Sequence, residues 1–187
     1  MAIDVEGLSI QKGLWYPSAD EECHPVVIEE VKKLELLLPL LPRYDLAVQA
    51  GGNVGVFPIG LIEMFGRVIT FEPDPLNFKA LQKNLENYVG VDYYNAALGD
   101  KEGKCHITDE FTHKNCGALK VAPGGDIPVM TIDSLMLPYC DLIYLDVEGY
   151  EDLALLGATE TIGQNHPVIV CENKGLSDRF PAGLDGS

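Results

Sequence analysis

Residues that could bind a ligand follow three short apolar runs of the 187-residue sequence. The run 46–48 leads into a glycine-rich turn that contains Gly51, Gly52, Asn53 and Gly55. Glycines permit positive φ and a close backbone approach, and a following helix start would offer free N–H donors. The next run, 68–71, ends at Glu72, where nucleotide-binding α/β folds place an acid that accepts hydrogen bonds from both ribose hydroxyls. In this order the two features predict an adenosyl cofactor, although a tight packing turn and a solvated glutamate remain the simpler alternatives.

A pair of acids, Asp146 and Glu148, follows the third run, 142–145. If the chain stays extended there, the two side chains share one side of the sheet end. One could then orient a ligand while the other accepts a proton as a general base. The alternatives are that Glu148 caps a helix beginning near Tyr150, and that His24 is the base. We predict no metal site, because no ligand spacing links His24 to the two acids.

The elements that would position these residues alternate along the chain. Apolar runs typical of buried parallel strands are 46–48, 68–71, 91–95, 142–145 and 168–171. Helical patterns lie between them at 54–65, 75–88 and 151–162, with a further helix at 25–38. We therefore predict a three-layer α/β fold with an open, mostly parallel sheet of the Rossmann-like kind.

Three segments do not follow this alternation. Two short strands, 104–108 and 129–132, flank a loop at 115–128, and the aromatic segment 13–17 precedes the first helix. We divide the chain into an N-terminal helical and aromatic segment (1–44) that packs on or caps the fold, a central domain (45–173) and an irregular tail (174–187). Trp15, Tyr16 and Tyr150 are candidates for an acceptor wall, or for a cap on the core, and Glu172 and Asn173 for acceptor contacts.

The turn reads G-G-N-x-G, without the G-x-G-x-x-G pattern that seats a dinucleotide. It resembles the glycine motif of class I S-adenosylmethionine-dependent methyltransferases. The ordered series VQAGGNVG, GRVITFEPDPLNFKALQKNL, NAALGD, TIDSL, DLIYLDVEGYEDLALLGA and PVIVCEN resembles the FkbM-type family of these enzymes over residues 45–173. DNA and RNA amino-group methyltransferases are disfavoured, because their Asn/Asp-Pro-Pro-aromatic sequence is absent after the fourth strand.

The resemblance implies S-adenosylmethionine as cofactor and a role for each matching residue. It places the turn and Glu72 against the cofactor, Asn95, Ala96 and Ala97 beside its adenine, and Asp146 and Glu148 where the methyl group is delivered. The chain departs from the family at Gln49, where an acid is usual and would help to hold the cationic methionine end. It also lacks the usual C-terminal β-hairpin, which would leave a sheet edge open for association between copies.

The composition argues against some classes of binding partner. With 29 acidic and 13 basic residues the formal net charge is −16, which opposes binding to nucleic acid. No apolar stretch is long enough for a membrane span, and the acidic start does not resemble a signal peptide, so we expect a cytoplasmic protein. The scattered cysteines are expected to be reduced, with Cys171 in the core.

These observations predict an S-adenosylmethionine-dependent O-methyltransferase. Its acceptor would be a hydroxyl of a sugar or another small molecule of secondary-metabolite type, methylated by in-line transfer. The alternative is a non-catalytic S-adenosylmethionine-binding or interaction module with a degenerate site, which Gln49 and the short C-terminus favour.

Overall fold

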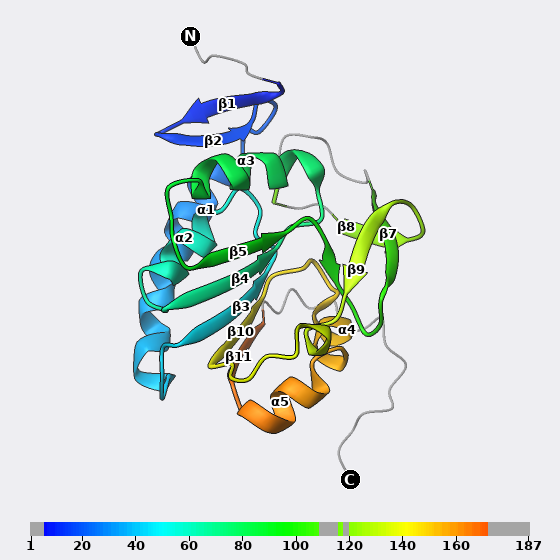
Figure 1. Ribbon diagram of the computed structural model, residues 1–187. Helices are drawn as coiled ribbons and strands as arrows, with labels where there is room; N and C mark the ends of the chain where they lie inside the picture. Colours follow the sequence, from blue (N-terminus) through cyan, green and yellow to red (C-terminus); the bar gives the residue numbers. More distant parts are fainter. Residues whose placement is uncertain (1–5, 109–115, 118–119, 172–187) are drawn as a thin grey trace.

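The computed structural model describes residues 6–108, 116–117 and 120–171, and within them it leaves aside the side chains of residues 24–27. Its centre is a twisted sheet in which all neighbouring strands are parallel (Figure 1). The strands, in spatial order, are β11 (Val168–Cys171), β10 (Leu142–Leu145), β3 (Leu46–Ala50), β4 (Arg67–Phe71) and β5 (Val91–Tyr94). The predicted α/β fold class and the five predicted strands are therefore confirmed.

Two hydrophobic cores lie on opposite faces of the sheet, because successive residues of a strand point to opposite sides. Ala47 of β3 belongs to the core beneath α1 (Cys23–Val31) and α2 (Val56–Ile62). Its neighbour Val48 belongs to the other core, beneath α4 (Glu151–Leu156). Figure 1 shows α1 and α2 on one side of the strands and α4 and α5 on the other. The sheet is thus the middle of three layers, which explains why its strands are mainly apolar.

Helix α3 (Pro75–Leu85) begins where the sequence predicts a start. The Asp74 side chain caps it by accepting hydrogen bonds from the backbone N–H groups of Leu76 (2.9 Å) and Asn77 (2.8 Å). Pro75 occupies the first helical position, where a missing N–H costs nothing. This cap fixes where the chain turns after Glu72, the predicted ribose ligand.

The helix predicted over 151–162 is two helices, α4 and α5 (Thr159–Asn165). The break occurs at Gly157, where an added Cβ would lie 2.0 Å from the carbonyl oxygen of Gly99. Asp133 then caps α5 from another segment, accepting from the N–H groups of Glu160 (3.0 Å) and Thr161 (2.8 Å). Burial raises the pKa of Asp133, but these hydrogen bonds outweigh it and the net shift is downward.

The N-terminal part contains a hairpin that the sequence reading missed. Strands β1 (Leu8–Gln11) and β2 (Leu14–Pro17) are antiparallel and joined by Lys12 and Gly13, both with positive φ. The predicted helix 25–38 is present as α1, which continues as the 3₁₀-helix η1 (Lys32–Leu40). Leu8 and Tyr16 share a core with Ala47, so the described residues of this N-terminal part pack on the central sheet. The boundary at residue 45 itself stays a prediction.

A second, smaller sheet lies beside the first and joins the carboxyl end of β5 to β10 (Figure 1). Its strands, in spatial order, are β6 (Ala97–Leu98), β9 (Ile127–Met130), β7 (Gly103–Thr108) and β8 (Lys120–Pro123), and the short 3₁₀-helix η2 (Asp133–Leu135) follows. Strands β7 and β9 confirm the two predicted near 104–108 and 129–132. The prediction of a loop throughout 115–128 is wrong, because β8 pairs with β7 inside it.

Strand β11 forms one edge of the central sheet, and among the described residues it pairs only with β10. Association of copies through this edge stays a prediction. Cys171 is exposed there, so its predicted core position is wrong, while Cys23, Cys105, Cys116 and Cys140 are buried free thiols. Glu172, Asn173 and the tail lie outside the described residues. Within the described part of the chain, no helix is long and apolar enough to cross a bilayer.

Candidate functional site

The glycine turn is held against the ends of two neighbouring strands. The N–H groups of Gly51 and Gly52 both donate to the carbonyl oxygen of Phe71, at 3.1 and 2.8 Å. Gly51 has φ +83°, and a Cβ added to it would lie 1.9 Å from the carbonyl oxygen of Asp146. Gly55 also has positive φ and directly precedes α2. The turn, which follows β3, therefore contacts the ends of β4 and β10. The contact with Asp146 leaves no room for a Cβ, so position 51 requires glycine.

Gln49, the departure from the family pattern, is fully buried in β3. Its Nε2 donates to the carbonyl oxygens of Ala50 (3.1 Å) and Gly51 (2.9 Å), and its Oε1 accepts from the Thr70 hydroxyl. A carboxylate could not donate either of the first two bonds. The amide thus supports the glycine turn from within, and a direct contact between Gln49 and a cofactor stays a prediction.

Glu72 follows β4 and is buried, with 5% of its surface exposed. Its Oε2 accepts from the backbone N–H of Asn53 at 2.7 Å, and its Oε1 from that of Asp74 at 2.8 Å. Burial raises the pKa of Glu72 to about 8, against the smaller lowering effect of these hydrogen bonds. The carboxyl group is thus positioned by the glycine turn on one side and by the start of α3 on the other.

The residues predicted beside the adenine follow β5. Asn95 Nδ2 donates to the carbonyl oxygens of Glu72 (2.9 Å) and Pro73 (3.0 Å), so this side chain fixes the backbone that carries the ribose candidate. Ala96 and Ala97 are buried and lie at the entry to the second sheet. The structure therefore brings Asn95 and Glu72 together, with the two alanines adjoining them in sequence.

Asp146 and Glu148 lie beyond the end of β10, both partly buried. The condition under which they would share one side of the sheet end, an extended chain, is not met, because β10 ends at Leu145, Glu148 has φ +53° and Gly149 has φ +95°. Helix α4 begins after Tyr150, whose own side chain makes no capping hydrogen bond, and the Glu151 carboxylate accepts from the N–H of Val147 (3.1 Å). A capping role for Glu148 stays a prediction. Asp146 stays next to the glycine turn, since its N–H donates to Ala50 O at 3.1 Å.

The Asn53 side chain points to a group that the sequence reading did not identify. Its Nδ2 donates to Cys23 Sγ at 3.1 Å, and its Oδ1 accepts from Cys116 Sγ–H at 3.3 Å. The Asp20 carboxylate lies within 4.8 Å of both sulfurs. No spacing signal could have shown this cluster, because its members come from three distant segments.

The aromatic N-terminal residues pack on α3. The Trp15 backbone exchanges hydrogen bonds with the Asn84 side chain (2.8 and 2.9 Å), and Lys83 Nζ lies 4.8 Å from the centre of the Trp15 ring. Tyr16 is fully buried, as the alternative of a core cap predicts. His24 lies in α1, and its side chain is among those not described.

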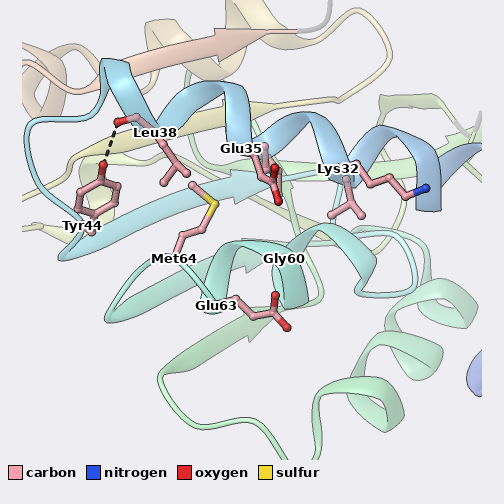
Figure 2. Close-up of a pocket in the computed structure, with 9 residues that line it drawn as sticks. Lys32, Glu35, Leu38, Tyr44, Gly60, Glu63 and Met64 are labelled. Atoms are coloured by element: carbon pink, nitrogen blue, oxygen red, sulfur yellow. Dashed lines mark hydrogen bonds between the residues drawn. The ribbon is translucent and has the colours of Figure 1, made fainter.

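An open groove of about 610 Å³ lies elsewhere, between η1 and α2. Figure 2 shows Lys32, Glu35 and Glu63 along it, with the Tyr44 hydroxyl donating to the Leu38 carbonyl at its far end (2.8 Å). None of the residues predicted to bind cofactor lines this groove. The groove and the glycine turn are therefore separate features of the surface.

Comparisons with known proteins agree with this arrangement. The family model described as "Methyltransferase FkbM domain" matches residues 49–183. A curated protein, "Methyltransferase 1" of Beauveria bassiana, is 31% identical over 71 residues, which are 36% of this chain and 28% of that protein. The crystal structure of Methyltransferase FkbM from Methylobacillus flagellatus KT superposes with a TM-score of 0.52 and 24% identity. That likeness covers 71% of this chain but 35% of the other, so this chain spans about a third of these relatives.

Proposed function

Because the chain belongs to the FkbM methyltransferase family, we propose that it transfers a methyl group to a hydroxyl of a sugar or another small metabolite. S-adenosylmethionine is the cofactor of this family. The observation that carries the proposal is the placement of the glycine turn, Glu72 and Asp146 at the carboxyl ends of β3, β4 and β10. Open α/β sheets bind their ligands outside the carboxyl ends of their strands.

The residues at the end of β4 fit the ribose of the cofactor. Each Glu72 oxygen accepts one backbone N–H, and the Asn77 side chain also hydrogen-bonds to the carboxyl group. The neighbouring hydroxyls of a ribose would supply further donors to this buried group. They would also favour its charged form, so cofactor affinity should increase with pH up to about 8, the pKa of Glu72 without ligand.

The chain's own residues divide the remaining work between holding and proton transfer. The bound cofactor supplies a methyl group on a positively charged sulfur. Asp146, whose backbone carbonyl lies against the glycine turn, would hold that positive charge with its carboxylate. Glu148 would accept the proton that the acceptor hydroxyl loses as its oxygen forms the new bond to carbon and the sulfur–carbon bond breaks. Its position in a turn beyond β10 leaves this carboxylate partly exposed to an incoming substrate.

The second candidate is a module that binds cofactor without turnover. It is favoured by Gln49, whose amide is bonded wholly within the chain where the family usually has an acid. In this case the cofactor would still bind, but the chain would form no S-adenosylhomocysteine. Variants of Asp146 or Glu148 would then leave the measured rate unchanged.

The experiment measures melting temperature and methyl transfer on the 187-residue chain. A ligand at 100 times its dissociation constant adds about 2.7 kcal/mol, which is roughly 5–10 °C in a domain of this size. Millimolar S-adenosylmethionine or S-adenosylhomocysteine should give such a shift, and Glu72→Ala should remove it. Glu63→Ala, which deletes an exposed acid of the separate groove, is the matched control and should keep it.

Activity is measured as S-adenosylhomocysteine release with a panel of monosaccharides and small alcohols. Glu148→Gln should lower the rate at least about 100-fold with the thermal shift kept, and Asp146→Asn should lower the rate as much and also reduce the thermal shift. Absence of a shift with both ligands would overturn cofactor binding by this chain. A shift with no turnover on any acceptor would favour the binding module.

A further inference from the structure

A buried group of two thiols and a carboxylate lies beside the glycine turn and has no part in the proposed methyl transfer. Cys23 Sγ, Cys116 Sγ and a carboxylate oxygen of Asp20 all lie within 4.8 Å of one another. We call these three residues, together with Asn53, the thiol cluster. Asp20 precedes α1, Cys23 begins it, and Cys116 precedes β8. The cluster therefore joins three separate segments, one of which is the turn.

Hydrogen bonds already orient the ligand atoms of the thiol cluster. Asp20 Oδ1 accepts from the backbone N–H groups of Cys23 (3.3 Å) and Cys116 (3.2 Å). Cys23 Sγ accepts from Asn53 Nδ2 at 3.1 Å and from the backbone N–H of Gly117. Donors of this kind support thiolate ligands in metal sites. The cluster thus has both the sulfur atoms and the surrounding donors that a metal–thiolate site needs.

The two sulfurs are joined by a hydrogen bond. A cation would replace the proton between the sulfurs and would offset the negative charge that this buried group otherwise concentrates.

The residue types select the cation. Thiolates are ligands for soft or borderline metals, and two of them with a carboxylate form a set that suits Zn²⁺ and excludes Mg²⁺ and Ca²⁺. In a tetrahedral zinc site, ligand atoms lie roughly 3.3–3.8 Å apart, given bonds of about 2.0–2.3 Å. Cys116 Sγ and Asn53 Oδ1 are already 3.3 Å apart. The ligand atoms of Asp20, Cys23 and Cys116 lie within 4.8 Å of one another, so their separations need to shorten by no more than about 1 Å.

We propose that Asp20, Cys23 and Cys116 bind one Zn²⁺ ion, with Asn53 Oδ1 as the fourth ligand. The ion joins the segment before α1 and the segment before β8 to the glycine turn. The backbone N–H of Asn53 donates to Glu72, the candidate ribose ligand. By fixing the position of Asn53, the ion would also fix that of the Glu72 carboxyl group. This is a structural role, independent of whether the chain transfers methyl groups.

The test is a titration of the reduced, chelator-treated 187-residue chain with Co²⁺, followed by absorption. One equivalent should produce sulfur-to-cobalt charge-transfer bands in the near ultraviolet and the visible bands of tetrahedral Co²⁺. Zn²⁺ should displace the cobalt and abolish both, and Mg²⁺ should not. Zinc should also raise the melting temperature of the treated chain by several degrees.

Variants assign the ligands. Cys23→Ser and Cys116→Ser should each weaken Zn²⁺ affinity at least about 100-fold and reduce the charge-transfer band, and Asp20→Asn should weaken affinity about 10-fold or more. Cys105→Ser, which alters a thiol that is equally buried in β7, is the matched control and should change neither.

Absence of the bands in the wild-type chain overturns the proposal, whatever the variants do, so a variant that fails to fold leaves the test intact. Loss of the bands in Cys105→Ser overturns the ligand assignment. The alternative is that Cys23 and Cys116 form a disulfide. In that case the mass of the metal-free chain falls by two hydrogen atoms under mild oxidation, and the chain binds no metal after reduction.

Discussion

The ends of β3 and β10 are neighbours in the sheet but are built in opposite ways. At the end of β3, Gln49 of the strand and the glycine turn that follows have polar groups bonded to one another and to β4. Beyond β10, Asp146 and Glu148 are partly exposed, and Glu148 has a backbone conformation that side chains other than glycine rarely adopt. Strain of this kind often marks functional sites, although Asn53 in the glycine turn also has positive φ. We therefore propose that the first end seats a ligand and that the second presents the reacting groups.

The largest effect is expected where the two ends touch, at Gly51. In Gly51→Ala, the added Cβ would lie 1.9 Å from the carbonyl oxygen of Asp146, and the residue would keep φ +83°. A backbone atom cannot move aside cheaply, so we expect a loss of about 3 kcal/mol or more in the free energy of unfolding. Urea denaturation measures it.

The control for this substitution is Gly163→Ala in α5, where an added Cβ meets nothing within 4 Å. Alanine favours a helix over glycine, so the control should gain up to about 1 kcal/mol. If Gly51→Ala is as stable as the wild-type chain, the two strand ends are not in contact and the comparison between them fails.

The second prediction concerns the pH dependence of stability beside the glycine turn. The pKa of Glu72 is about 8 in the folded chain, against an ordinary value of 4.5. Between these values the folded chain binds more protons than the unfolded chain. The contribution of Glu72 is therefore fully present below about pH 4.5 and is lost as the pH rises to about 8.

Glu72→Gln should remove this decline, which amounts to a few kcal/mol, because an amide does not ionise in this range. Denaturation at a series of pH values measures the slope for both chains. Glu102→Gln, a change at an exposed acid before β7, should keep the wild-type slope. An unchanged slope in Glu72→Gln would mean that Glu72 is already ionised at neutral pH in the folded chain.

The region around the glycine turn was also the part that the sequence predicted well. Apolar runs gave the parallel strands, since both faces of the sheet are covered, and the apolar stripe over 75–88 gave α3, whose cap at Asp74 and first residue Pro75 are local features. The hairpin was not predicted, although Gly13 in its two-residue turn is a local signal for one.

The segment beyond β10 and the thiol cluster were not predictable in the same way. An extended pattern through Asp146 and Glu148 fails because two consecutive residues there adopt positive φ, and glutamate gives no signal for it. Cys23 and Cys116 meet only because the N-terminal segment packs over the glycine turn. Such contacts depend on tertiary packing, which short sequence patterns do not describe.

The smallest change in stability is expected for Glu148→Gly. This substitution distinguishes the backbone strain at position 148 from the proposed role of its carboxylate in methyl transfer. Glycine adopts φ +53° without the steric cost that glutamate bears, although it also loses more backbone entropy on folding. Glu148→Gly should therefore alter the free energy of unfolding by less than about 1 kcal/mol, in the stabilising direction. Methyl transfer should nevertheless fall as far as in Glu148→Gln, which keeps the strain and removes only the carboxylate. If Glu148→Gly retains transfer, the proton goes elsewhere; if it is markedly less stable, the Glu148 side chain supports the turn, and the two strand ends do not differ as proposed.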